Sequence, residues 1–278
     1  MEAEEVKKSR NSSITRLSSA LTLFPIVAVI LVIGNQHMIS IGMAVIALLS
    51  MYEYLQAASK KSNPIKWVAY LSCVLISLLG FVTPQMYGNV ILSAIPILLL
   101  VLFLQVIGSG MKTNFNDLIY TFLGIIYIVF FIGSMSMIRN LENGKILMWY
   151  VIFSGWATDV FAYAVGKRIG RHKFSKVSPK KSIEGCIAGT IAAIIIVLVY
   201  TYFINVYTSV EYSYLAVSIL ALVLSIIGQI GDFAASSIKR YVEIKDYSDL
   251  IPGHGGMLDR IDSVLFIAPF AYILLQLL

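Results

Sequence analysis

Long apolar stretches recur along most of this chain and limit its fold more than any other feature does. A helix needs about 20 apolar residues to cross the hydrocarbon core of a bilayer. Segments of about that length occupy 17–34, 38–57, 66–83, 89–108, 117–138, 145–166, 185–204, 213–231 and 261–278. We therefore expect an all-α fold, a polytopic integral membrane protein with about nine transmembrane helices.

The composition excludes the usual soluble classes. Of 278 residues, 58% are hydrophobic and only 13% are charged, a balance that soluble domains of this size do not have. The net charge of +6 suggests nucleic acid at first sight, but membrane topology and anionic lipid headgroups explain it better. We expect membrane lipids and no nucleic acid as partners. The first apolar segment is too long for a signal peptide and lacks a cleavage site, so we treat it as retained.

The positions of the cations predict which ends of the helices face the cytoplasm. Of the 21 Lys and Arg residues, all but Arg139 and Lys145 fall in the N-terminal tail or in every second connection. The positive-inside rule then places the N-terminus and those connections in the cytoplasm, and the C-terminus outside, in the cell (inner) membrane. We expect a polar cytoplasmic tail at 1–16 and a single membrane domain at 17–278. Within that domain, N-terminal spans (17–138) precede a catalytic half (145–278).

The stretch from 232 to 262 concentrates charge between the last two apolar segments. Charged groups near hydrocarbon are costly and persist mostly at functional sites. If the helix from 213 continues to Arg240, then Asp232, Ser236, Lys239 and Arg240 share one face. A helix cap with cations reaching the membrane surface is the plainer interpretation.

A glycine-rich turn, Pro252-Gly-His-Gly-Gly256, precedes Asp259 and Asp262. Glycine permits positive φ, so such a turn can aim backbone amides at an anion, although a plain loop is equally consistent with it. The two acids are three residues apart and share a helix face. Their oxygens suit Mg²⁺, which also binds substrate phosphates; a surface charge cluster is the alternative. His254 is a candidate acid, base or phosphate ligand.

The other long basic connection begins near Asp159 and Tyr163, four residues apart, and ends at Ser178-Pro-Lys180-Lys181-Ser182 and Glu184. Its lysines and hydroxyls suit triphosphate oxygens, whereas a loop that only sets topology is the rival interpretation. Glu53 is the remaining acid inside a predicted span. It either lines a cavity for a lipid headgroup or forms a helix–helix hydrogen bond.

These motifs together resemble the signature of phosphatidate cytidylyltransferases, also called CDP-diacylglycerol synthases. The resemblance rests on Ser236-Ser-Ile-Lys239-Arg240, Lys245-Asp246-Tyr-Ser248 and the run from Leu250 to Asp262, and on Asp159 to Gly166 and Ser178 to Gly185. Ser182 stands where the family commonly has Thr and keeps the hydroxyl. The resemblance is strong in the C-terminal half, whereas the first five spans match only in being hydrophobic.

The resemblance implies that the chain joins CTP to phosphatidic acid, giving CDP-diacylglycerol and pyrophosphate with Mg²⁺ as cofactor. It places the metal pair at Asp232 and Asp259, with Asp262 beside it, and a second cation is left open. Catalytic residues are then Asp232, Asp259, Asp262, Lys239 and His254. Substrate-binding residues are Ser178, Lys180, Lys181, Ser182, Glu184, Ser236, Arg240, Lys245, Asp246, Gly255, Gly256, Arg260, Asp159 and Tyr163.

Three other functions share some of these features. A CDP-archaeol synthase or a polyprenol kinase would keep the metal chemistry and change the lipid. An ion-coupled transporter would use Glu53, Asp159 and Asp232 along a path, but transporters of that kind often show repeated halves, and none is visible here. A homodimer is also left open.

Overall fold

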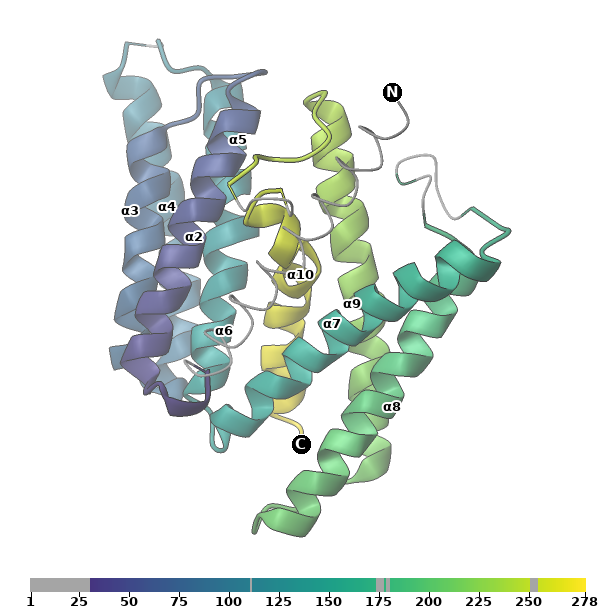
Figure 1. The fold of residues 1–278 in the computed structure, drawn as a ribbon. Helices are drawn as coiled ribbons and strands as arrows, with labels where there is room; N and C mark the ends of the chain where they lie inside the picture. Colours follow the sequence, from purple (N-terminus) through teal and green to yellow (C-terminus); the bar gives the residue numbers. More distant parts are fainter. Residues whose placement is uncertain (1–30, 111, 174–177, 179–180, 251–254) are drawn as a thin grey trace. The chain divides into compact units, whose positions relative to one another are not determined.

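The computed structural model describes residues 31–110, 112–173, 178, 181–250 and 255–278, and they are almost entirely helical. The α-helices, coloured along the chain in Figure 1, are α2 (Gln36–Ala58), α3 (Lys66–Leu75), α4 (Tyr87–Gly108), α5 (Phe115–Gly124), α6 (Phe131–Arg139), α7 (Gly144–Ile169), α8 (Ile183–Tyr207), α9 (Tyr214–Tyr241) and α10 (Leu258–Leu275). Short 3₁₀ segments at Ile76–Phe81 (η1) and Pro84–Met86 (η2) and a π-helix at Ile125–Phe130 (η3) join some of them. Within the described ranges no β-strand forms, so the all-α class is confirmed.

Six of these helical segments are long and apolar enough to cross a membrane, as judged by length and composition over the described residues. They are Gln36–Ala58, Pro84–Gly108, Phe115–Arg139, Gly144–Ile169, Ile183–Tyr207 and Tyr214–Tyr241. The chain is thus a multi-pass membrane protein. Three of the nine expected spans are not among the six, so that count stays a prediction. The segment 66–83 forms a shorter apolar helix, Lys66–Phe81, and α10 carries Asp259, Arg260 and Asp262 in its first turns. The expected first span, 17–34, lies mostly outside the described residues.

The chain divides into two compact units, each described here by itself. The first unit holds residues 1–129 and 242–260, and the second unit holds residues 130–241 and 261–278. This division follows contacts within the fold, and the expected division into spans 17–138 and a catalytic half 145–278 stays a prediction.

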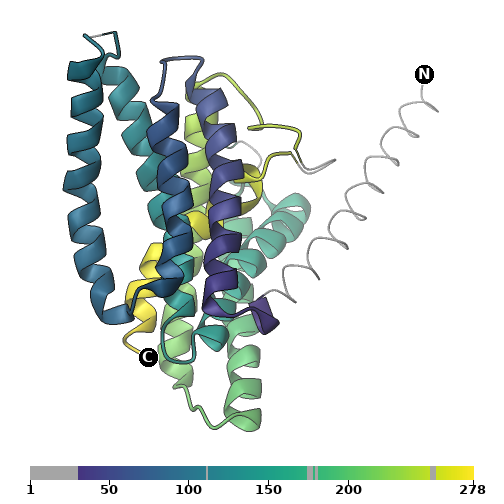
Figure 2. The same cartoon turned by 90° about the vertical axis from the view of Figure 1, so that its left-hand side faces the viewer.

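The helices of the first unit pack with their long axes roughly aligned (Figure 2). Helix α2 packs against α3 and α5, and α5 also packs against α4. The backbone of Gly124 in α5 lies close to the ring of Tyr54, since a Cβ atom there would collide with that ring. The Tyr54 hydroxyl donates to the backbone oxygen of Tyr120 at 2.9 Å. Helix α4 leaves most of its surface uncovered; Leu92, for example, is 76% exposed. Because an exposed leucine is favourable in hydrocarbon and not in water, this face suits contact with lipid.

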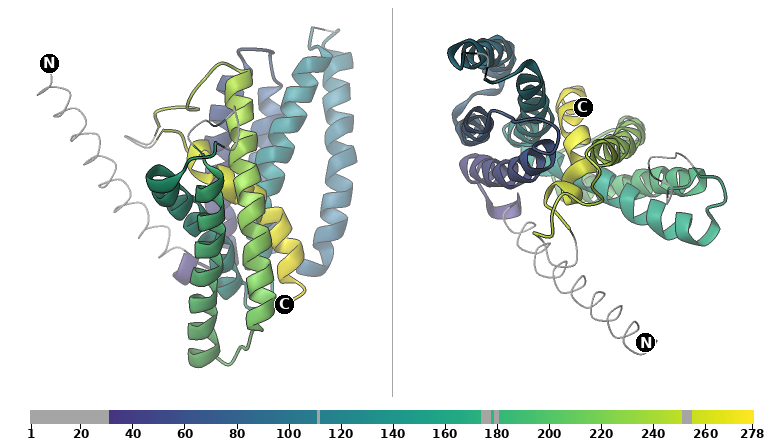
Figure 3. Two further views of the ribbon diagram at one scale, coloured as in Figure 1. Left: turned by 90° about the vertical axis from the view of Figure 1, so that its right-hand side faces the viewer. Right: turned by 90° about the horizontal axis from the view of Figure 1, so that it is seen from above.

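The second unit is built on close contact among α7, α8 and α9 (Figure 3). Two glycines of α8 permit that contact. A Cβ atom at Gly185 would lie 2.6 Å from the backbone oxygen of Ala162, and one at Gly189 would lie 2.6 Å from that of Thr158. Small residues at helix interfaces are the usual device for tight packing in membranes, where apolar burial alone does not drive helices together.

A buried polar network links the same three helices. Thr158 Oγ1 lies 2.7 Å from Ser225 Oγ, and Ser225 Oγ lies 3.0 Å from Thr190 Oγ1. Gln229 Nε2 also donates to Thr190 Oγ1 at 3.0 Å. Each helix therefore satisfies polar side chains of its neighbours, which fixes the rotation of α7, α8 and α9 about their axes.

Replacing Thr158 by Val is expected to lower the free energy of unfolding by about 1 kcal/mol, because interhelical hydrogen bonds in membrane proteins contribute that order. Thermal unfolding of the detergent-solubilised protein measures the change. Ser218→Ala is the matched control, since the Ser218 hydroxyl is exposed and donates to the backbone oxygen of Tyr214 in its own helix. Equal shifts in Tm for both variants would argue against the network.

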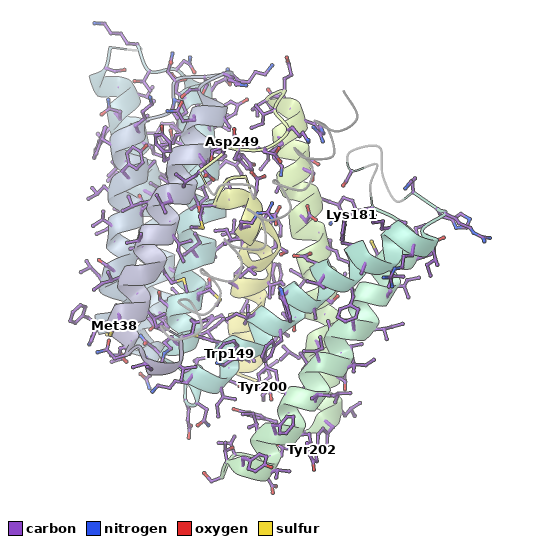
Figure 4. All side chains as sticks on the ribbon, in the orientation of Figure 1. Met38, Trp149, Lys181, Tyr200, Tyr202 and Asp249 are labelled. Carbon is purple, nitrogen blue, oxygen red and sulfur yellow. The ribbon has the colours of Figure 1, made fainter. Side chains whose placement is uncertain are left out.

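An aromatic cluster closes the other end of the α7–α8 pair. The rings of Phe153 and Tyr150 on α7 each lie 5.1 Å from that of Tyr200 on α8, and the ring of Trp149 lies tilted against that of Phe153 at 5.3 Å. Trp149 and Tyr200 are labelled in Figure 4. Aromatic side chains of this kind favour the boundary between hydrocarbon and water. The cluster therefore suits the membrane surface opposite to the end that carries the basic connection.

Candidate functional site

Two backbone amides of the charged segment after α9 bind one carboxylate in the first unit, that of Asp259. Asp259 is only 9% exposed, and its Oδ2 accepts hydrogen bonds from the backbone N–H of Tyr247 at 2.8 Å and of Gly256 at 3.2 Å. Gly255 has a φ of +83°, a conformation that strongly favours glycine. The expected departure from helix at this turn is confirmed at Gly255, and Asp259 organises the backbone on both sides of the turn.

A second buried acid holds the same segment. Glu53 on α2 is 1% exposed and accepts from Ser248 Oγ at 2.5 Å and from the backbone N–H of Met257 at 2.9 Å and of Leu258 at 2.8 Å. Glu53 therefore serves the first amides of α10. Sequence analysis singled out Glu53 as an acid within a span but left its partner open, since these partners lie about 200 positions away along the chain.

Three carboxylates gather in the second unit. Asp262 is 8% exposed and interacts electrostatically with Asp232 and Asp159, and with the ammonium group of Lys239. Asp159 Oδ2 accepts from Ser263 Oγ at 2.7 Å. Helices α9 and α10 approach closely here, because a Cβ atom at Gly231 would lie 2.9 Å from the backbone oxygen of Asp262. The acids from α7, α9 and α10 thus occupy one region of this unit.

The end of α9 carries the expected charged face. The helix continues to Tyr241, so Asp232, Ser236, Lys239 and Arg240 lie on one regular helix, as predicted. Lys181 forms an ion pair with Asp232, and its ammonium group lies 4.5 Å from the ring centre of Phe233. This contact brings the basic connection before α8 to the acid at position 232.

Side-chain hydrogen bonds hold the described residues at the two ends of that basic connection. Ser182 is buried, and its Oγ accepts from the backbone N–H of Gly185 at 3.2 Å, which caps α8. Glu184 accepts from His172 Nδ1 at 2.6 Å and from the backbone N–H groups of Arg171 and His172 at 3.2 Å. Both side chains were expected to bind substrate. The structure gives them roles in the loop, and substrate contact stays a prediction.

The predicted site residues divide between the two units. The second unit contains Asp159, Tyr163, Ser178, Lys181, Ser182, Glu184, Asp232, Ser236, Lys239, Arg240 and Asp262, and the first contains Lys245, Asp246, Gly255, Gly256, Asp259 and Arg260. Lys180 and His254 lie outside the described residues. Asp232 and Asp259 fall in different units, so their pairing around a metal stays a prediction. Tyr163 is 69% exposed, and Lys167 lies 5.9 Å from its ring centre.

Sequence analysis missed the residues that support these acids. Ser263 holds Asp159, and Tyr247 holds Asp259 through its backbone. Their only sequence signal is proximity to the charged segment, which does not distinguish them from their neighbours.

The chemistry of the donors fits Mg²⁺, although no protein cage is formed. Among the residues that the structure describes, no three His, Cys, Asp or Glu side chains converge as a metal site. Mg²⁺ commonly binds through one or two carboxylates, with waters and substrate phosphates as the other ligands. The carboxylates at Asp159, Asp232 and Asp262 are hard oxygen donors gathered in one unit, so they suit a divalent cation of this kind.

Comparison with known proteins gives a consistent result. A model of the cytidylyltransferase family matches residues 14–278. A phosphatidate cytidylyltransferase of Bacillus subtilis is 36% identical over 166 residues, 59% of this chain and 60% of that protein. Proteins of the same name from Staphylococcus haemolyticus and Staphylococcus saprophyticus are 31% and 30% identical over 72% and 82% of this chain, and over 76% and 90% of their own lengths. The matched region thus spans about three fifths of the Bacillus subtilis protein and nine tenths of the Staphylococcus saprophyticus protein. With the motifs described above and the family match over nearly the whole sequence, the chain belongs to the cytidylyltransferase family.

Proposed function

We propose that the protein is a phosphatidate cytidylyltransferase, which converts CTP and phosphatidic acid into CDP-diacylglycerol and pyrophosphate in phospholipid biosynthesis. The observation that carries this proposal is the family match over residues 14–278. The relatives that bear this name, the spans that favour a lipid environment, and the cations beside carboxylates in the second unit support it further.

The reaction needs little proton chemistry from the protein. A phosphate oxygen of phosphatidic acid attacks the α-phosphorus of CTP, a new P–O bond forms, and the bond to the bridging oxygen breaks, so pyrophosphate leaves with the electron pair. Phosphatidic acid is already an anionic nucleophile and requires no strong base. The main barrier is the approach of two polyanions, which fixed cations and precise positioning reduce.

Cations of both units would hold the phosphates. Lys181, Lys239 and Arg240 of the second unit would bind phosphate oxygens, as would Arg260 and Lys245 of the first and Lys180 outside the described part. Lysine gives a compact charge and arginine a bidentate fork for this task. Ser178, Ser182 and Ser236 would donate hydroxyl hydrogens, and the amides beside Gly255 and Gly256 would approach the triphosphate. Tyr163, Glu184 and Asp246 would orient the nucleotide or these cations.

Asp232 and Asp259 would hold Mg²⁺, with Asp262 beside them. Asp159 would help to bind substrate, and His254 would be a further phosphate ligand or acid. A metal bound by these carboxylates would supply positive charge to offset the negative charge of the phosphates during cytidylyl transfer. A second cation is part of the proposal, because three carboxylates gather in the second unit beside two lysines, Lys181 and Lys239.

The topology that we propose has nine spans, with the N-terminus and the site in the cytoplasm and the C-terminus outside. The segregation of Lys and Arg supports it. The region 17–278 would then form a single membrane domain, and a homodimer would be compatible with it.

Incubation of the purified full chain with labelled CTP, phosphatidic acid and Mg²⁺ tests the function. We expect lipid-dependent formation of CDP-diacylglycerol with stoichiometric release of pyrophosphate. Lys181→Gln should lower the rate about 10–100-fold, since hydrogen bonds to charged groups contribute on the order of 1.5–3 kcal/mol. Lys145→Gln is the matched control, because Lys145 is an exposed lysine in the first turn of α7, at the end opposite to the basic connection. Two results would contradict the proposal: transfer of only a phosphate group from CTP to a polyprenol, or no transfer from CTP to any lipid.

A further inference from the structure

Glu53 is an acid on an apolar helix, far in sequence from the family signature. It lies in the last third of α2, is 1% exposed, and belongs to the same unit as the segment 242–260. We propose that Glu53 is a positioning residue for the proposed cytidylyl transfer, holding the glycine-rich segment and, through it, the carboxylate of Asp259. The inference rests on the proposed function for its kinetic consequences.

The contacts of Glu53 match those of a helix N-cap supplied by another helix. Its carboxylate accepts from the backbone N–H groups of Met257 and Leu258 at the start of α10. The first amides of any helix lack intrahelical partners, and a negative charge beside them is favoured by the helix dipole. Helix α10 therefore obtains from α2 an acceptor for two backbone amides at its start.

The fit around this carboxylate is close. A Cβ atom at Gly256 would lie 2.6 Å from Glu53 Oε2, so a larger residue there would collide with the carboxylate. Ser248, which precedes the glycine-rich segment in the sequence, donates its hydroxyl to Glu53 Oε1 at 2.5 Å. Glu53 thus binds Ser248 on one side of the glycine-rich segment and Met257 and Leu258 on the other, which are here called its two arms.

The two buried acids bind neighbouring groups of the same turn. On one arm, Tyr247 donates its N–H to Asp259 and Ser248 donates its hydroxyl to Glu53. On the other arm, Gly256 donates to Asp259 and Met257 donates to Glu53. Because adjacent residues of one backbone cannot move independently, displacement from Glu53 also displaces the donors that orient Asp259.

Stability alone does not account for an acid at this position. A buried carboxylate loses solvation, and an apolar residue of similar volume is often as stable or more so. An acid within a membrane helix is accordingly a marker of function. When a residue that orients a metal-binding or catalytic side chain is replaced, activity or metal affinity usually falls about 10–100-fold.

The test compares Glu53→Gln, Glu53→Asp and a control, Tyr54→Phe, in the purified full chain. Gln keeps the volume and one acceptor oxygen but turns an amide group toward a backbone N–H. Asp keeps both oxygens on a shorter side chain. Tyr54→Phe removes a buried hydrogen bond from the adjacent position of α2, to Tyr120, without touching the turn.

We expect Glu53→Gln to lower kcat about 10–100-fold and to raise the Mg²⁺ concentration for half-maximal rate about 10-fold. Glu53→Asp should recover a substantial part of both losses, and Tyr54→Phe should change each less than about 2-fold. A second readout is independent of activity: trypsin should cleave after the exposed Lys245 faster in Glu53→Gln than in the wild type or Tyr54→Phe.

The outcomes separate the inference from the function on which it rests. A folded wild type without lipid-dependent transfer would overturn the proposed function. An active wild type with Glu53→Gln as active as Tyr54→Phe would overturn the positioning role alone. Slow Glu53→Gln with unchanged Mg²⁺ dependence and unchanged cleavage at Lys245 would also overturn it. If Glu53→Gln does not fold, Glu53→Asp decides, because its shorter side chain should still lower kcat and weaken Mg²⁺ dependence more than Tyr54→Phe does; equal values for these two variants would overturn the positioning role.

Discussion

Replacing Asp259 by Asn should lower CDP-diacylglycerol formation about 1,000-fold at saturating substrates. A bound divalent cation contributes several kcal/mol to the stability of a transition state, and each 1.36 kcal/mol is a factor of ten in rate. The amide of Asn keeps an oxygen that can accept from the N–H groups of Tyr247 and Gly256, which Asp259 Oδ2 now binds. The variant therefore removes the charge while largely preserving the turn.

Asp232→Asn should lower the rate of CDP-diacylglycerol formation by a similar factor for the same reason, although the surroundings of Asp232 differ. Asp232 pairs with Lys181, so its replacement also removes the partner of that lysine.

At position 259, Asp259→Ala removes both the negative charge and the hydrogen-bond acceptor, whereas Asp259→Asn removes the charge alone. Comparison of these two variants therefore separates the contributions of charge and of hydrogen bonding. Asp249→Asn is the matched control: Asp249, labelled in Figure 4, is an exposed acid of the same segment. Mg²⁺-dependent turnover near the wild-type rate in Asp259→Asn or Asp232→Asn would remove that residue from the metal site.

The second large effect concerns folding rather than chemistry. Gly189→Leu should destabilise the second unit by about 3 kcal/mol, at the upper end of the usual range for overpacking, because the new side chain meets a backbone oxygen. A Cβ atom at Gly189 would already lie 2.6 Å from the backbone oxygen of Thr158, and backbone cannot rotate away as a side chain can. We expect a lower Tm and a smaller monodisperse fraction in detergent.

Gly42→Leu is the control for this substitution, since a Cβ atom at Gly42 on α2 would have no neighbour within 4 Å. There the same residue change should be neutral or slightly stabilising, because Leu has a better helix propensity than Gly. Equal losses at the two positions would show that added bulk, and not close packing of α7 on α8, causes the effect.

The helical class was predictable because each span is a local property of the sequence. An apolar run of about 20 residues must satisfy its own backbone hydrogen bonds, and a helix does so without partners elsewhere. The continuation of α9 to Tyr241 was predictable in the same way, from the spacing of Asp232, Ser236 and Lys239. The expected count of nine spans stays a prediction, since the segment 66–83 contains a 3₁₀ segment and the first five residues of α10 include three charged ones.

Sequence alone determined the membrane class and the helix ends where acids and cations concentrate, because composition and short-range spacing carry both. The family followed from the resemblance of its motifs to those of known enzymes. Only the tertiary structure decided which groups those side chains meet. Glu53 binds amides about 200 residues away, Ser263 holds Asp159, and Glu184 turns back to His172. Packing of distant helices sets these partners, and no local pattern around Glu53, Asp159 or Glu184 specifies which distant backbone or hydroxyl group will arrive beside it.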